Sequence, residues 1–241
     1  MPSFKVICNI GIYVTNNELL VASEMIARAI LAQAAIKGSY ISSINFYTEE
    51  LRSALLSEQE IVGMMGEALS EKQFVIYFQP QYEHSTKMLV GAEALVRWIH
   101  PTKGIISPAD FIPIFEKNGF ITDLDLYVFS QTCAFQKKCL ENKMRIVPIS
   151  INFSRNDIFA KNIVEEMEKI RSMYDVPAKY LRVEITETSM AGESSFVNQV
   201  IKKMHSYGYI VEMDDFGSGY SSLNTLKDVS FDIVKLDMRF L

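Results

Sequence analysis

Six apolar runs alternate with helical patterns through most of this chain, and this alternation limits the folds that it can adopt. The runs lie at residues 74–82, 88–98, 145–153, 181–186, 209–213 and 232–236, with helical patterns near 108–117, 123–142, 157–174, 192–207 and 219–227. A short polar turn joins the first two runs, so we expect a hairpin there. The later runs follow the β-α-β rhythm of a parallel sheet, which fits either a doubly wound sheet or a (β/α) barrel.

The first 70 residues carry a different pattern. Residues 4–14 predict a buried strand, residues 18–37 predict a helix closed by Gly38, and residues 40–47 predict a second strand. A mixed polar and apolar pattern over 49–70 predicts a helix at the surface or between domains. We therefore divide the chain into residues 1–50, a connecting helix at 51–70 and a main domain at 71–241.

The composition excludes several classes of protein. With 49% hydrophobic and 22% charged residues the chain is globular, and its net charge of −5 argues against binding to a DNA or RNA polymer. The three cysteines form no C-x-x-C pair and the three histidines are scattered, so we expect no zinc site. Neither an apolar membrane span nor a signal peptide is evident in the sequence, and we expect a cytoplasmic location.

The apolar run at 209–213 stops on two adjacent acids, Asp214 and Asp215, and enters a loop that contains Gly217 and Gly219. Neighbouring strand residues point to opposite faces. Both acids can therefore share one site only if the strand ends there and Asp215 lies in the turn, which glycine permits. Paired carboxylates at a strand end suit hard metal ions, whereas a solvated Asp-Gly loop is the alternative.

Polar residues also interrupt the other late runs, where an interior strand should be apolar. They are Glu93 and Arg97, Asn152, Glu184, the acids at 214 and 215, and Lys235. In a parallel arrangement these points lie at the C-terminal edge of the sheet, and a shared cation avoids the cost of burying each one alone. Each has a structural alternative: Glu93 could pair with Arg97, Asn152 could cap a turn, and Lys235 could extend to the surface.

The segment Glu93-Ala94-Leu95-Val96-Arg97-Trp98 resembles the signature of EAL domains, the bacterial phosphodiesterases that act on cyclic-di-GMP. Further matching segments are YFQP at 77–80, RWIHP at 97–101, ISIN at 149–152, EITE at 184–187, DDFGSGY at 214–220 and KLD at 235–237. The resemblance extends from about residue 71 to residue 241. It implies an α/β fold, a TIM-like barrel whose first strand runs antiparallel to the others.

The resemblance also implies two divalent ions, Mg²⁺ or Mn²⁺, and hydrolysis of cyclic-di-GMP to linear pGpG. The residues that match the ligands of one ion are Glu93, Asn152, Glu184 and Asp214, and those that match the ligands of the second are Asp214 and Asp215. The matches to catalytic residues are Asp215, Lys235, which helps to hold the attacking water, and Glu187, which steadies the loop over 215–223. The matches to substrate-binding residues are Arg97, which contacts a phosphate, and Gln79 and Leu95, which line the substrate.

The family's remaining positions, a metal-binding Glu past a seventh strand and a Gln near the eighth, would follow Leu241. A complete (β/α)₈ barrel needs about 200–250 residues. We therefore expect residues 71–241 to form a barrel truncated after about six strands, within a longer protein, and to have little activity alone. The alternative function is a catalytically inactive receptor for cyclic-di-GMP.

Residues 1–50 resemble, less specifically, the C-terminal tail of a GGDEF domain. Gly11-Ile12 and the Ala-rich helix that ends at Lys37-Gly38 carry this resemblance. We therefore expect an upstream sensor or GGDEF domain in the parent protein, whose tethering to the cytoplasmic face of a membrane stays open. A homodimer is also expected, because EAL domains often dimerise.

Overall fold

The structure is a computed structural model that describes residues 7–15, 20–36, 43–190, 194–217 and 229–238. The chain divides into two compact units, Met1–Met64 and Met65–Leu241. The predicted helix at 219–227, both Gly38 and Gly219, and the beginnings of the first two predicted strands lie outside the described residues. No helix in the described part of the chain is long and apolar enough to cross a bilayer.

The first unit contains a β-α-β arrangement of β1 (Asn9–Ile12), α1 (Ala22–Ala34) and β2 (Ser43–Phe46), in which the strands are parallel. Gly11 permits a close approach of β1 to α1, because a Cβ there would lie 2.0 Å from the Ala29 carbonyl oxygen. The helix ends at Ala34 with Ala35 as its cap, earlier than the predicted end at residue 37. Helix ends fray and are the least predictable part of an element.

The predicted helix over 49–70 is present as α2 (Glu49–Ser70). Ile61 and Ala68 are its buried residues. Just beyond it, the Gln73 side-chain oxygen accepts a hydrogen bond from Trp98 Nε1 at 3.0 Å. The Gln73 carbonyl accepts another from the Ile99 backbone N–H at 2.9 Å. These two bonds connect the segment after α2 to the strand that carries the EAL signature.

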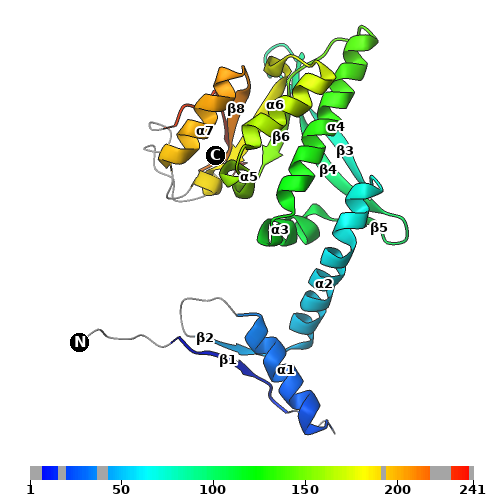
Figure 1. Ribbon diagram of the computed structural model, residues 1–241, viewed down its shortest axis with the longest axis vertical. Coiled ribbons are helices and arrows are strands. Elements are labelled where there is room, and N and C mark those ends of the chain that lie inside the picture. The colour runs from blue at the N-terminus through cyan, green and yellow to red at the C-terminus, as the bar shows by residue number, and fades with distance from the viewer. Residues whose placement is uncertain (1–6, 16–19, 37–42, 191–193, 218–228, 239–241) are drawn as a thin grey trace, which may run out of the picture. The chain divides into compact units, whose positions relative to one another are not determined.

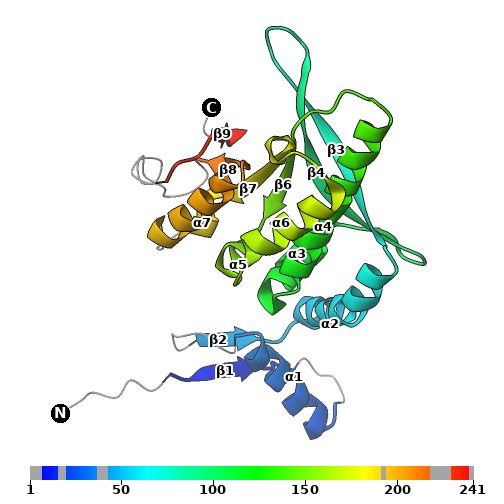
Figure 2. The ribbon, with the colours of Figure 1, turned by 45° about the horizontal axis from the view of Figure 1, so that its top comes forward.

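The second unit is built on a seven-stranded sheet, seen in Figure 2. Its strands are β3 (Phe74–Tyr82), β4 (Leu89–His100), β5 (Gly104–Ile106), β6 (Ile149–Phe153), β7 (Leu181–Thr186), β8 (Ile210–Phe216) and β9 (Ile233–Leu236). The predicted hairpin is confirmed, because β3 and β4 pair antiparallel. The parallel order is confirmed as β4, β6, β7, β8 and β9. The pattern did not predict β5, which pairs antiparallel with β4.

Helices cover one face of this sheet. They are α3 (Pro108–Asn118), α4 (Ile121–Glu141), α5 (Arg155–Phe159), α6 (Ile163–Tyr174) and α7 (Ser194–Ser206). Two short 3-10 helices, η1 (Ala178–Tyr180) and η2 (Glu187–Met190), directly precede and follow β7. Figure 1 shows α4, α6 and α7 side by side on that face. Within the described residues no pairing joins β3 to β9, so the sheet stays open between these strands. The antiparallel first strand and the parallel remainder are the arrangement that the resemblance implied.

One predicted helix and one predicted strand of the second unit differ from the pattern in ways that local residues explain. The helix predicted over 157–174 is two helices, α5 and α6, because Ala160 is extended and Asn162 adopts a left-handed φ of 64° between them. A capping box at Ser154 and Asp157 starts α5 earlier than the pattern indicated. The strand predicted over 145–153 is only Ile149–Phe153, and it follows Pro148, which has no N–H for a sheet.

An aromatic core holds α3 against the hairpin. Trp98, Phe74, Phe111 and Phe115 are each at most 1% exposed. The rings of Phe74 and Trp98 are 5.1 Å apart, and Trp98 meets Phe111 edge-on at 5.6 Å, which are favourable arrangements for aromatic pairs. This packing fixes β4, and therefore fixes the backbone on which Glu93 and Arg97 are placed.

Candidate active site

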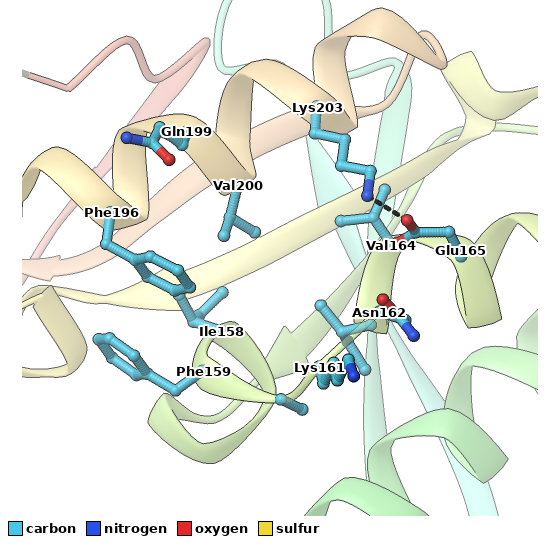
Figure 3. Close-up of a pocket in the computed structure, with 12 residues that line it drawn as sticks. Ile158, Phe159, Lys161, Asn162, Val164, Glu165, Phe196, Gln199, Val200 and Lys203 are labelled. Atoms are coloured by element: carbon cyan, nitrogen blue, oxygen red, sulfur yellow. Dashed lines mark hydrogen bonds and ion pairs between the residues drawn. The ribbon is translucent and has the colours of Figure 1, made fainter.

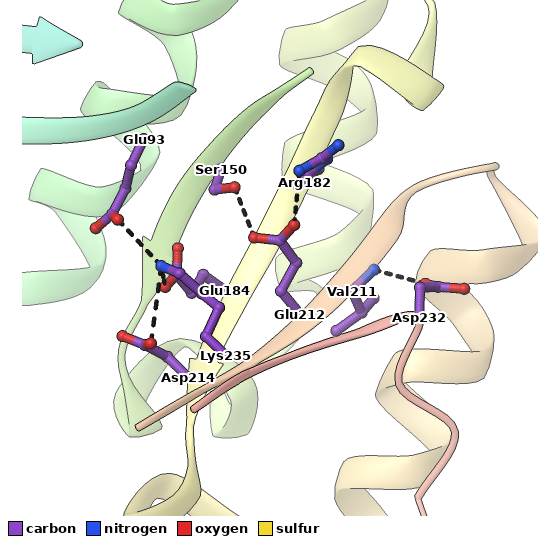
Figure 4. Close-up of polar contacts among 9 residues, drawn as sticks. All are labelled: Glu93, Ser150, Arg182, Glu184, Val211, Glu212, Asp214, Asp232 and Lys235. Carbon is purple, nitrogen blue, oxygen red and sulfur yellow. Dashed lines mark hydrogen bonds and ion pairs between the residues drawn. The ribbon is translucent and has the colours of Figure 1, made fainter. Parts of the chain in front are cut away.

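Lys235 lies at the centre of a cluster of acids that come from different strands. Its Nζ, on β9, is 3.0 Å from Glu93 Oε2 on β4 and 3.7 Å from Asp214 Oδ1 on β8, and it donates a hydrogen bond to Glu184 Oε1 on β7. Figure 4 shows the three carboxylates directed toward the ammonium group. The predicted convergence of the strand ends is therefore present for these four residues, and we call them, together with Asn152, the upper layer.

Strand register explains this convergence. Asn152 lies opposite Glu184 on β6 and β7, and the Asn152 side-chain amide donates a hydrogen bond to Glu93 Oε1 at 3.1 Å. Asp214 lies opposite Thr186 near the end of β7. Because β4, β6, β7 and β8 are parallel neighbours, side chains near their C-terminal ends meet at one edge of the sheet.

The strand β8 does not stop at Met213, as the sequence pattern predicted. It continues through both acids to Phe216, with an irregularity in its pairing to β9 between Met213 and Phe216. Asp215 has a φ of 54° there. A bulge of this kind re-aims side chains along a strand, and does so without ending it. The structure thus differs from the predicted turn.

Burial makes the charge on Glu184 unfavourable. Glu184 is 1% exposed, and this burial raises its pKa to about 8, helped by repulsion from Glu93 and Asp214 and opposed by Lys235. Burial alone would lower the pKa of Lys235, but its contacts with Glu184 and Glu93 outweigh this effect and hold it above its usual value. Three acids around one ammonium leave the cluster short of positive charge.

The chemistry of the cluster fits a divalent cation. Glu184 Oε2 is buried without a hydrogen-bond partner among the described residues, and an unpaired buried carboxylate oxygen is costly. Carboxylate and amide oxygens are the ligands that Mg²⁺ and Mn²⁺ prefer. In the described part of the chain no three His, Cys, Asp or Glu side chains are already arranged around a metal position. The Lys235 ammonium lies between the acids instead.

Glu187 contacts the loop that follows β8. It begins η2, is 3% exposed, and its Oε2 accepts a hydrogen bond from the Gly217 N–H at 2.8 Å. This contact is the geometry that a residue steadying the loop after Asp215 requires. The part of the predicted 215–223 loop beyond residue 217 lies outside the described residues.

A small cavity lies between β4, α3 and α4, beside Asn152. Its volume is about 120 Å³, and the residues that line it include Leu95, Arg97, Pro108, Ile112, Asp125 and Asn152. It therefore brings together two of the predicted substrate-binding residues and one predicted metal ligand. The Arg97 guanidinium lies 5.9 Å from the Tyr77 ring, and Gln79 is exposed on β3 directly opposite Glu93.

Asp125, in α4, is a cavity residue that the sequence reasoning missed. It is 8% exposed, and burial, followed by repulsion from Asp157, raises its pKa well above the usual range. A signal was present in the sequence, because Asp125 belongs to the buried stripe of α4 with Leu124, Val128 and Phe129. An acid in such a stripe is unusual enough to indicate a special environment.

A larger groove lies away from the acids. It has a volume of about 450 Å³ and runs between α5, α6 and α7, as Figure 3 shows. Phe159 and Phe196 stack on one another at its base with ring centroids 5.1 Å apart, and an ion pair joins Lys203 to Glu165. None of the predicted site residues is among the described residues that line it. Size alone therefore does not identify the site.

Several known proteins resemble this chain in sequence. The sequence matches the EAL domain family over residues 63–241. The signalling protein YkoW of Bacillus subtilis is 27% identical over 235 residues, which are 97% of this chain and 29% of YkoW. The cyclic di-GMP phosphodiesterase PA2567 of Pseudomonas aeruginosa is 32% identical over 173 residues, which are 71% of this chain and 29% of that protein.

A solved structure shows the same fold. The c-di-GMP complex of the PaMucR phosphodiesterase superposes with a TM-score of 0.70 at 27% identity, and the match covers 74% of this chain and 72% of that one. The chain spans 28–29% of the length of the curated relatives that it matches first.

Proposed function

The chain belongs to the EAL domain family, and from this premise we propose that the protein hydrolyses cyclic-di-GMP to linear pGpG. The observation that carries this proposal is the convergence of Glu93, Glu184 and Asp214, from three strands, on the single cation of Lys235. Relatives that are named cyclic di-GMP phosphodiesterases support the substrate and the reaction class.

The carboxylate and amide oxygens of the upper layer are the proposed metal ligands. Glu93, Asn152, Glu184 and Asp214 would hold one Mg²⁺ or Mn²⁺ ion, and Asp214 and Asp215 would contribute to a second. When bound, such a pair of ions activates a water molecule and stabilises the leaving oxygen of a phosphodiester. The raised pKa of Glu184 and its unpaired oxygen support a ligand role, because both are relieved by a nearby positive charge.

The remaining site residues would bind the substrate and orient the attacking water. Lys235 would hold the attacking water by donating a hydrogen bond from Nζ, because its ammonium already lies among the acids. Arg97, beside the cavity, would neutralise a phosphate, for which a guanidinium is well suited. Leu95 and Gln79 would line the bound nucleotide, and Glu187 would hold the loop after Asp215 through Gly217.

The first unit supports a proposal about domain organisation. We propose that residues 1–50 are the C-terminal part of a GGDEF-type domain, followed by a connecting helix at 51–70. Ile10, Ile44 and Phe46 on its two strands are 44%, 59% and 53% exposed, which is the apolar surface that a larger domain would cover. MucR of Pseudomonas aeruginosa, a bifunctional diguanylate cyclase/cyclic di-GMP phosphodiesterase, aligns over 98% of this chain. A homodimer, an upstream sensor and a cytoplasmic location complete the proposal.

The function is tested by incubating cyclic-di-GMP with the protein in Mg²⁺, in Mn²⁺ and in a chelator, in separate reactions. The products of each reaction are then separated by chromatography. We expect linear pGpG only with a divalent ion, and loss of product in Glu184→Gln. Glu165→Gln, the same change at the exposed pair with Lys203, is the matched control and should retain turnover. Binding without any turnover would instead identify an inactive receptor.

A further inference from the structure

A second polar layer lies directly beneath the upper layer. Side chains two positions apart on a strand point to the same face. Each of four site strands therefore places one further residue below its site residue. The four residues, which we call the lower layer, are Gly91 before Glu93, Ser150 before Asn152, Arg182 before Glu184 and Glu212 before Asp214.

Glu212 is the centre of the lower layer. It is 1% exposed, and Ser150 is fully buried. Glu212 Oε2 accepts a hydrogen bond from Ser150 Oγ at 2.6 Å, and Oε1 accepts one from Arg182 Nη1 at 3.0 Å. Figure 4 shows this group on β6, β7 and β8, next to the acids around Lys235. One carboxylate thus connects three neighbouring strands through side chains alone.

Gly91 leaves the space that this arrangement needs. A Cβ at position 91 would lie 3.3 Å from Arg182 Nη1 and 2.7 Å from Gln81 Oε1. Any larger residue at position 91 would therefore crowd the Arg182 guanidinium, which donates a hydrogen bond to Glu212. Strand β4 therefore contributes space at Gly91, where the other three strands contribute side chains. The lower layer thus extends from β4 to β8.

The two layers differ in charge balance. The lower layer pairs one carboxylate with one guanidinium, so it carries no excess charge that a ligand could neutralise. A buried ion pair of this kind often adds little to stability compared with apolar residues of the same size. Removing only one partner of the pair, however, leaves the other charge buried and unpaired. We expect the neighbouring strands to shift in response. Those strands carry Glu184 and Asp214 two residues further on.

We propose that Arg182 and Glu212 are positioning residues, which fix Glu184 and Asp214 at the spacing that divalent ions require. This inference rests on the proposed function, since it concerns the same metal ligands. Residues that hydrogen-bond to metal ligands typically change metal affinity by about 10–100-fold when they are mutated, and we expect the lower end of this range for residues that act through the backbone. Arg182 and Glu212 would act through backbone position, and neither needs to touch the metal.

The test is a Mn²⁺ titration of the whole protein, in which the free ion is measured by electron paramagnetic resonance. Arg182→Met and Glu212→Leu should each weaken Mn²⁺ binding by about 10-fold or more. The double variant Arg182→Met/Glu212→Leu should recover an Mn²⁺ affinity within about threefold of the unmutated protein, because no charge is left unpaired. Ser150→Ala, which removes one hydrogen bond and no charge, is a milder variant and should weaken binding by about twofold to fivefold.

The ion pair of Arg171 with Glu168 on α6 supplies the matched control. Arg171→Met should lower the melting temperature and leave Mn²⁺ affinity unchanged. Single variants of the lower layer that lose stability but bind Mn²⁺ like the parent would overturn the positioning role. So would a double variant that binds as weakly as the singles. A parent that binds no Mn²⁺ would overturn the proposed metal site itself, and this inference with it.

Discussion

The upper and lower layers of the sheet interior are both built around buried acids, but they differ in charge balance. In the upper layer three carboxylates surround one ammonium, whereas in the lower layer a single carboxylate meets a single guanidinium. Both layers have a nearly inaccessible acid, Glu184 above and Glu212 below. The difference teaches that burial alone does not distinguish a functional acid from a structural one. The metal role proposed for Glu184 rests instead on the unbalanced charge around it.

The largest expected effect comes from the upper layer. Asp214→Asn should lower metal-dependent turnover of cyclic-di-GMP by about 100-fold or more, because this residue is expected to contact both ions. The unfolding free energy should fall little, since the change removes one member of a group of like charges. Steady-state kinetics and urea unfolding of the same sample measure both quantities. Unchanged turnover would remove Asp214 from the metal site.

In the lower layer, by contrast, a single substitution should cause a large loss of stability. Glu212→Leu leaves the Arg182 guanidinium buried without its acid, and should lower the unfolding free energy by about 3–5 kcal/mol. Adding Arg182→Met should restore most of this loss. Urea unfolding of the two single variants and the double variant measures the coupling. Losses that simply add would show that the two side chains do not act as a pair.

The pH dependence of stability sharpens the comparison further. Burial raises the folded-state pKa of Glu184 to about 8, above its ordinary value of 4.5. The folded protein therefore holds this proton more tightly than the unfolded chain, so stability that is present below about pH 4.5 declines as the pH rises toward about 8. Thermal melts of the metal-free protein across this range should show the decline. Glu184→Gln should flatten it, and a parent with the same slope as this variant would contradict the assignment.

The smallest effect is expected outside both layers. Glu165→Gln breaks the exposed ion pair with Lys203 beside the α6–α7 groove, and should change the unfolding free energy by less than about 1 kcal/mol. Turnover should be the same as in the parent, because none of the predicted site residues lines that groove. A clear loss of turnover would show that the groove communicates with the acid cluster.

The sequence allowed much of the upper layer to be predicted. Alternating apolar runs and helical patterns indicated parallel strands, and polar residues at the ends of such strands must share one edge. This reasoning placed Glu93, Asn152, Glu184 and Asp214 together, and the register of the strands agrees. The antiparallel first strand came from the family resemblance and the short turn after residue 82.

The lower layer could not be predicted in the same way. Arg182 and Glu212 are 30 residues apart, and their contact depends on how β7 and β8 align, which a single strand pattern does not contain. The bulge at Asp215 was missed because the apolar run ends at Met213 while the pairing continues to Phe216. Asp125 was missed because its burial, and its closeness to Asp157 on a different helix, depend on how the helices pack, which the pattern of one helix does not contain.

The central claim is that the upper layer binds divalent ions, and anomalous X-ray diffraction from crystals soaked in Mn²⁺ tests it most directly. We predict Mn²⁺ peaks among the side-chain oxygens of Glu93, Asn152, Glu184 and Asp214, with Lys235 Nζ displaced from between the acids. A map without such peaks, in which Lys235 keeps its contacts with Glu93 and Glu184, would contradict the account.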